Sequence, residues 1–163
     1  MSIILSCDRQ FGFKTKSSTN LCTMISKETI AYYVENQSPV FCTFLDASEA
    51  FDKVNYCKLF NLLLKRELPV LIIRILANLY TNNFVCIYWG GTTTDYFSVI
   101  NRVKQGAVLS PILFCVYIDD LLLLLSKAGV GCYIGQHFVG ALAYADDLVI
   151  IAPTASALRR LLV

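Results

Sequence analysis

Two adjacent carboxylates, Asp146 and Asp147, lie between two apolar segments of the sequence. One apolar segment precedes them through Tyr144 and Ala145, and the other, residues 148–152, follows directly. Two apolar strands joined by a short turn are typical of a β-hairpin, so the carboxylates would lie at its tip. Buried carboxylates are unfavourable unless they are paired with a cation, and neither segment supplies a basic residue. Because oxygen ligands suit Mg²⁺, the hairpin is a candidate cation site.

A third carboxylate, Asp46, ends another apolar segment, residues 40–45, which predicts a strand. If that strand lies beside the hairpin, Asp46 meets Asp146 and Asp147. Three close carboxylates cannot all ionise without raised pKa values or a bound metal. Two metal ions held by such a cluster can stabilise the attacking and leaving oxygens of a phosphoryl transfer. There are plainer explanations, because a strand-end Asp is usually a turn or cap residue and an Asp-Asp pair usually lies in a solvated loop.

A loop-to-helix junction lies between the two acidic segments. Gln105 and Gly106 come first, and Ser110 and Pro111 precede a long apolar segment. Ser110 as the N-cap with Pro111 at the first helical position predicts a helix that runs to about Ser126. Gly106 would let the backbone approach a ligand closely. Taken alone, these residues also fit an ordinary junction without a binding role.

Together these segments resemble the motifs of a reverse transcriptase of the non-LTR (LINE-type) retrotransposon group. Residues 44–52 resemble its motif A, residues 105–114 its motif B, and residues 143–147, with Tyr-Ala-Asp-Asp, its motif C. Residues 10–19 resemble a fingers-region motif of the same group. Tyr-Ala-Asp-Asp alone recurs by chance, whereas four motifs in the family's order, spread over residues 10–152, are specific.

The resemblance implies an RNA-directed DNA polymerase that transfers deoxynucleotides to a primer 3′-hydroxyl with two metal ions, Mg²⁺ or Mn²⁺. It implies RNA template, DNA primer and deoxynucleotides as partners, with missing fingers and thumb segments supplied by a longer polyprotein. It also implies an intracellular location, in the nucleus or in the cytoplasm as a ribonucleoprotein. The implied catalytic residues and metal ligands are Asp46, Asp146 and Asp147, the last with a weaker or indirect role.

The resemblance further implies a set of nucleotide- and template-binding residues. Phe51 matches the aromatic position that blocks a ribose 2′-hydroxyl, and the backbone at Ala47 would lie near the incoming triphosphate. Tyr144 would lie near the primer end. The remaining members would line the nucleotide and template pocket or contact template and phosphate, and they are Gln105, Gly106, Lys14 and Lys16.

The hydrophobic periodicity predicts an α+β fold, and the resemblance makes it a polymerase palm in which helices back one face of an antiparallel sheet, with part of the fingers. The chain is expected to be a single truncated domain, with residues 1–38 as partial fingers and residues 39–163 as palm with inserted fingers elements and no thumb. The predicted helices are 20–35, 55–66, 69–80, 110–126 and 155–162. The predicted strands are 39–45, 84–89, 95–100, 131–135, 138–144 and 147–152.

Composition leaves other functions open. The net charge is only +2, although phosphate neutralisation drives the affinity of a polymerase for nucleic acid. This low charge, together with the expected truncation, favours a catalytically inactive retrotransposon remnant as an alternative. A palm-fold binding module is a second alternative, because the apolar area exposed by a missing thumb could serve as an interface. The longest apolar stretch, residues 108–125, contains Pro111 and two carboxylates, so no membrane span is expected.

Two further groups of residues are assigned structural roles. The seven cysteines show no metal-binding spacing and lie mostly in apolar segments, so they are expected to be reduced core residues. Asp119 and Asp120 fall inside the predicted helix 110–126, where adjacent side chains diverge by about 100°. We interpret this pair as the solvated edge of that helix.

Overall fold

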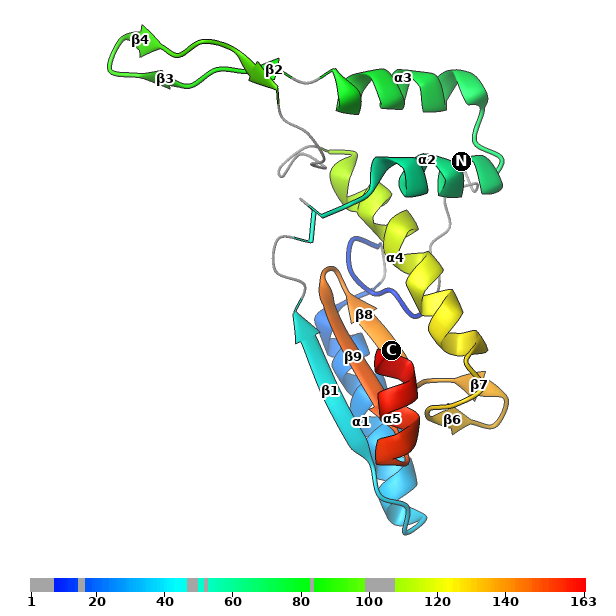
Figure 1. Cartoon of the computed structure of the whole chain (residues 1–163). Helices are drawn as coiled ribbons and strands as arrows, with labels where there is room; N and C mark the ends of the chain where they lie inside the picture. The colour runs from blue at the N-terminus through cyan, green and yellow to red at the C-terminus, as the bar shows by residue number, and fades with distance from the viewer. Residues whose placement is uncertain (1–7, 15–16, 47–49, 52, 83, 99–107) are drawn as a thin grey trace. The chain divides into compact units, whose positions relative to one another are not determined.

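The computed structural model describes residues 8–14, 17–46, 50–51, 53–82, 84–98 and 108–163 (Figure 1). The chain divides into two compact units. The sheet unit is formed by Leu5–Ser48 and Ile118–Val163, and the helical unit by Met1–Ile4 and Glu49–Tyr117. One helix, α4 (Ser110–Lys127), contributes residues to both units.

A three-stranded antiparallel sheet forms the centre of the sheet unit. Its strands are β1 (Phe41–Asp46), β8 (Ala141–Tyr144) and β9 (Asp147–Ala152), in the order β1-β9-β8. Strand β9 is a nearly continuous apolar run rather than an alternating one, which is typical of a strand buried on both faces. The acidic turn and the end of β1 therefore meet at one end of this sheet (Figure 1).

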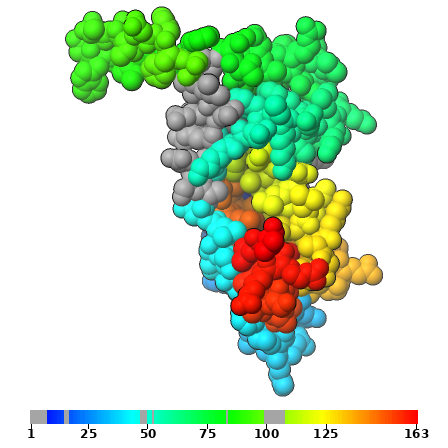
Figure 2. Space-filling view, in the orientation of Figure 1, coloured from blue at the N-terminus to red at the C-terminus, as the bar shows by residue number. Residues whose placement is uncertain are grey.

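Helices cover both faces of the sheet. On one face, α1 (Thr19–Glu35) packs on β8, and the buried core there consists of Phe11, Cys22, Cys132, Leu142, Val149 and Ile151. On the other face, α5 (Ala155–Leu162) lies over β9 and β1, as Figure 2 shows. The core of that face consists of Leu122, Leu125, Phe138, Ala141, Ala143, Ile150, Ala152 and Leu161. The expectation of helices on one face is wrong, because the apolar run of β9 requires cover on both sides.

Short segments complete the sheet unit. The outer edge of β8 is covered by residues 9–11, because the Phe11 N–H donates to the Ala143 carbonyl (2.8 Å) and the Ala143 N–H donates to the Arg9 carbonyl (2.8 Å). The predicted strand 138–144 is interrupted at Gly140, which separates β7 (His137–Phe138) from β8. Strand β7 pairs instead with β6 (Tyr133–Ile134) in a small hairpin.

The helical unit contains α2 (Tyr56–Lys65), α3 (Val70–Thr81) and a hairpin built from short strands. The hairpin strands are β2 (Phe84–Val85), β3 (Tyr88–Trp89), β4 (Thr92–Thr93) and β5 (Phe97–Ser98). The predicted strand 84–89 is broken because the Thr94 hydroxyl, rather than a strand carbonyl, accepts the Ile87 N–H at 3.0 Å. The periodicity of the sequence does not reveal a side-chain hydroxyl that takes the place of a backbone carbonyl between two strands.

Side-chain caps explain where three helices begin. The side chains of Ser18, Asn55 and Thr154 accept backbone N–H groups in the first turns of α1, α2 and α5, respectively. Such caps satisfy N–H groups that have no partner within the helix. No helix in the described ranges is both long and apolar enough to cross a bilayer.

The interpretation of Asp119 as a solvated residue is wrong. Asp119 is only 3% exposed, whereas Asp120 is half-buried. Asp119 lies three residues from both Val116 and Leu122, and residues at this spacing share a helix face. Since both neighbours are fully buried, that face of α4 takes Asp119 inward with them.

The cysteines differ in burial, and the expectation of core positions is wrong for Cys57 on α2 and Cys42 on β1, which are exposed. Burial raises the pKa of the Cys132 thiol to about 11, and it also raises the pKa of the Cys22 thiol. Because the thiolate is the nucleophile, we expect iodoacetamide at pH 8 to modify Cys57 rapidly and to modify Cys132 at least about 100-fold more slowly. Mass spectrometry of timed samples measures both rates. Equal rates in the folded protein, with the urea-unfolded chain as the control, would contradict the packing around Cys132.

Candidate active site

A two-residue turn carries one of the candidate carboxylates. Tyr144 ends β8, Asp147 begins β9, and these two residues are paired, so only Ala145 and Asp146 lie between them. Two-residue hairpin loops favour positive φ because this matches the twist of the strands. Ala145 accordingly has φ of 57°, a left-handed conformation that residues with a Cβ rarely adopt.

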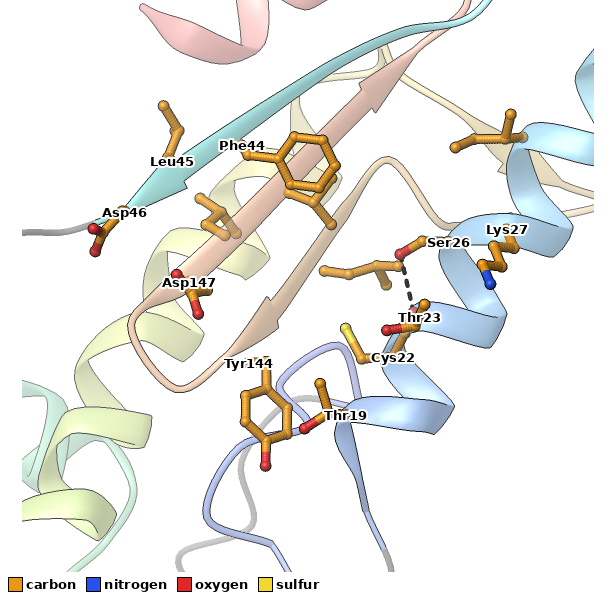
Figure 3. Close-up of a pocket in the computed structure, with 14 residues that line it drawn as sticks. Thr19, Cys22, Thr23, Ser26, Lys27, Phe44, Leu45, Asp46, Tyr144 and Asp147 are labelled. Carbon is orange, nitrogen blue, oxygen red and sulfur yellow. Dashed lines mark hydrogen bonds between the residues drawn. The ribbon is translucent and has the colours of Figure 1, made fainter.

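The register of the sheet places two carboxylates side by side. Asp46 at the end of β1 lies directly opposite Asp147 in β9, and Tyr144 lies opposite Asp147 on the other side. Directly opposite residues share a face of the sheet, with Cβ atoms typically about 4.5–5.5 Å apart. Figure 3 shows Asp46, the last residue of β1, and Asp147, the first residue of β9, at the same end of the sheet. Asp46 and Asp147 are exposed, and Asp146 is half-buried in the turn.

A pocket opens between α1 and the face of the sheet that carries these residues (Figure 3). Its volume is about 570 Å³, and Asp46, Tyr144 and Asp147 contribute to its wall at one end. Away from the carboxylates the wall is largely apolar. Its α1 side includes Cys22 and Ser26, whose hydroxyl donates to the Cys22 carbonyl at 2.9 Å.

The donor atoms fit a divalent cation only in part. Within the described residues, no group of three or more His, Cys, Asp or Glu side chains is arranged to hold a metal ion. The carboxylates of Asp46 and Asp147 are nevertheless adjacent, and like charges directly opposite in a sheet are destabilising without a counter-ion. Mg²⁺ is commonly held by one or two carboxylates together with substrate phosphates. The pair therefore fits a cation whose remaining ligands come from a substrate.

The other predicted site residues are distributed over the chain. Lys14 is half-buried in the sheet unit. Phe51 belongs to the helical unit, where its ring packs on Phe114 of α4 with the ring centroids 4.6 Å apart and the planes tilted by 31°. Four predicted residues lie outside the described residues: Ala47, Lys16, Gln105 and Gly106.

Sequence reasoning missed the residue that contacts the acidic turn most closely. Gln10 is fully buried, and its side-chain Oε1 accepts the backbone N–H groups of Ala145 (3.1 Å) and Gly12 (2.8 Å). Its Nε2 donates to the Ala145 carbonyl (3.1 Å). Gln10 was part of the segment that resembles a fingers motif, but a contact across 135 positions leaves no local pattern.

Gly12 permits this close approach. A Cβ at Gly12 would lie 2.2 Å from the Ala145 nitrogen and 2.7 Å from its Cα, which is closer than non-bonded atoms can approach. The glycine is required here because the backbone of residues 10–12 lies directly against the turn.

We expect Gly12→Ala to lower the free energy of unfolding by about 1–3 kcal/mol, since the added methyl group overpacks against Ala145. Chemical denaturation measures the loss, and the NMR shift of the Ala145 amide reports on the turn. Gly140→Ala is the matched control, because its Cβ would collide with the Phe138 ring (2.7 Å) and not with the turn. Both variants should be destabilised, but only Gly12→Ala should move the Ala145 amide signal. An unchanged signal would refute the contact.

Known proteins resemble this chain in sequence and in fold. Residues 3–163 match the family described as reverse transcriptase (RNA-dependent DNA polymerase). The Pol polyprotein of the retrotransposable element R2DM of Drosophila melanogaster is 34% identical over 118 residues, which cover 72% of this chain and 11% of that protein. The R2 polyprotein of Nasonia vitripennis is 30% identical over 120 residues, which cover 74% of this chain and 12% of that protein.

A third relative is the probable RNA-directed DNA polymerase of the X-element of Drosophila melanogaster, 30% identical over 70% of this chain and 12% of its own length. The chain thus spans about a tenth of the length of these non-LTR retrotransposon relatives. The apo telomerase of Candida tropicalis, truncated from the C-terminal domain, superposes with a TM-score of 0.64 at 18% identity, over 93% of this chain and 31% of that one. This likeness confirms the α+β polymerase fold. The chain therefore belongs to the reverse transcriptase family.

Proposed function

We propose that this chain provides the palm and part of the fingers of an RNA-directed DNA polymerase that extends a DNA primer on an RNA template. The observation that carries the proposal is the pairing of Asp46 with Asp147 beside the turn that holds Asp146. Carboxylates from two strands thereby gather at one end of a sheet whose faces are otherwise apolar. Like charges directly opposite in a sheet are destabilising, and a bound cation would relieve this repulsion.

In the proposed reaction the primer 3′-oxygen attacks the α-phosphorus of a deoxynucleoside triphosphate. One P–O bond forms, the bond to pyrophosphate breaks, and the proton of the 3′-hydroxyl passes to solvent. Two Mg²⁺ ions, when bound, would neutralise the phosphate charge and align the attacking and leaving oxygens. Asp46 and Asp146 would hold these ions, and Asp147 would complete the carboxylate cluster.

Neighbouring residues are proposed to orient the substrates. Tyr144 shares the face of Asp46 and Asp147 and contributes to the pocket wall, so the primer end is its proposed contact. Lys14 would contact template or triphosphate through its positive charge. Nucleotide- or template-binding roles are proposed for Ala47, Lys16, Gln105 and Gly106.

We expect Asp146→Asn to abolish primer extension, because an amide keeps the shape of the side chain but removes the negative charge that holds a cation. The loss should exceed the roughly 10- to 100-fold effect that follows removal of a partner of a metal ligand. The assay is extension of a DNA primer on an RNA template with Mg²⁺ and deoxynucleotides. Asp95→Asn is the matched control, because Asp95 is exposed in the hairpin of the helical unit and should keep wild-type activity.

The result also separates the alternative functions. Equal extension by the wild type and Asp146→Asn would refute the role of Asp146. A folded wild type that extends no primer would favour an inactive remnant or a binding module that keeps the polymerase fold.

Phe51 is proposed to exclude ribonucleotides by colliding with a 2′-hydroxyl. Its packing on Phe114 would hold the ring in place. We expect Phe51→Ala to increase ribonucleotide incorporation relative to deoxynucleotide incorporation by about tenfold or more, the scale on which one extra group is discriminated. Competitive primer extension measures the ratio.

The control for this substitution is Phe60→Ala, which removes a ring that stacks on Tyr56 in α2 with the centroids 6.0 Å apart. That variant should lose stability without a change in sugar selectivity. An unchanged ratio in Phe51→Ala, or an equal change in Phe60→Ala, would contradict the proposed exclusion.

A further inference from the structure

We propose that Gln10 is a positioning residue for the acidic turn, and that its buried amide fixes the backbone of Ala145 so that Asp146 is held where it can bind a divalent cation. The catalytic purpose of this contact rests on the proposed function. The contact itself lies wholly within the sheet unit.

The hydrogen bonds reach both peptide groups that flank Ala145. Oε1 of Gln10 accepts the N–H of the peptide that joins Tyr144 to Ala145, at 3.1 Å. Nε2 donates to the carbonyl of the peptide that joins Ala145 to Asp146, also at 3.1 Å. Because the second peptide includes the Asp146 nitrogen, the side chain of Gln10 restricts the backbone from which Asp146 projects.

The orientation of the Gln10 amide is determined by its partners. Oε1 also accepts the Gly12 N–H at 2.8 Å, and backbone N–H groups can only donate, so the oxygen must face both Gly12 and Ala145. The side chain is fully buried, and a buried amide without partners would be strongly destabilising. Rotation of Gln10 away from the turn is therefore unfavourable, and the amide acts as a fixed bracket.

The turn needs such support because its conformation is unfavourable. Ala145 has φ of 57°, where the Cβ is crowded by the following carbonyl. The pairing of Tyr144 with Asp147 favours this conformation, and the two hydrogen bonds to Gln10 add to it by holding both peptide groups of Ala145. Without these hydrogen bonds the turn, and with it the carboxylate of Asp146, would be less restricted.

The sheet itself does not depend on this bracket. Strands β8 and β9 pair over four positions, and apolar clusters cover both faces. Loss of the Gln10 amide should consequently release the turn while the strands stay paired. This separation distinguishes a positioning role from a general structural one.

The test compares Gln10→Met, which has similar length and no hydrogen-bonding amide, with the wild type. Gln136→Met is the matched control, because Gln136 is exposed between β6 and β7. Amide hydrogen exchange by NMR reports on the bracket. Mn²⁺ titration, followed by paramagnetic broadening of the amide signals around the turn, gives the cation affinity without any catalytic assay.

In Gln10→Met we expect the Ala145 and Gly12 amides to lose protection while the amides of Ile150 and Ile151 keep theirs. The affinity for Mn²⁺ should fall by about 10- to 100-fold, the usual effect of removing a group that orients a metal ligand. Gln136→Met should match the wild type in both measurements. Lost protection with unchanged affinity would overturn the proposal, because Gln10 would then only stabilise the fold.

A second variant covers the case in which Gln10→Met does not fold. Gln10→Asn keeps a buried amide but is one methylene shorter, so it cannot make the same hydrogen bonds to Gly12 and to both peptide groups of Ala145. We expect this variant to bind Mn²⁺ more weakly than the wild type. An affinity equal to that of the wild type in folded Gln10→Asn would overturn the proposal.

Primer extension by the same preparations separates this inference from the proposed function. Cation binding that depends on Gln10, in a chain that extends no primer, supports the inference and counts against polymerase activity of this chain. A wild-type turn that binds no Mn²⁺ overturns the inference, whatever the extension assay shows.

Discussion

The register between β1 and β9 is the constraint on which the candidate site depends. Six consecutive pairs, from Phe41 opposite Ala152 to Asp46 opposite Asp147, set the alignment. A shift by one residue would turn every side chain of β1 to the other face, so Asp46 would no longer share a face with Asp147. The register of β1 thus decides whether two carboxylates meet.

A second level of organisation acts on the turn rather than on the strands. The sheet brings the end of β1 to the acidic hairpin, but it leaves the two residues of the turn without ladder partners. The segment that contains Gln10 and Gly12 lies against this turn. Gln10 supplies hydrogen bonds, and Gly12 has no side chain that would collide with Ala145. The left-handed Ala145 is tolerated because its neighbours leave no room for an alternative.

Local patterns predicted most of the elements and part of the site. The helices begin and end within one residue of their predicted limits, which hydrophobic periodicity sets locally, although the caps Ser18 and Asn55 were not used in the prediction. The proximity of Asp46 to the hairpin followed from the assumption that two apolar strands are neighbours, and the register confirms that neighbourhood for Asp147. The functional roles of these residues, and of those outside the described ranges, stay predictions.

The sequence analysis failed where contacts with residues distant in the sequence decide the position of a side chain. Gln10 contacts a residue 135 positions away, and Asp119 is turned inward by the buried face of α4 rather than by its own polarity. The helix on the second face of the sheet was missed because the amphipathic pattern of a helix does not indicate which face of a sheet the helix packs on. Such tertiary contacts decide a conformation without changing the local periodicity from which elements are predicted.

The two edges of the sheet differ in whether a neighbouring segment covers them, and this difference affects association with other chains. Residues 9–11 cover the outer edge of β8, whereas β1 pairs with β9 alone within the residues that the structure describes. Phe44, near the middle of β1, is 81% exposed. An edge strand with unpaired backbone groups and an exposed aromatic ring is a template for a further strand, whether from a longer polyprotein or from a second copy. A further strand would therefore add to the β1 edge, where Asp46 lies, and not to the β8 edge, which residues 9–11 cover.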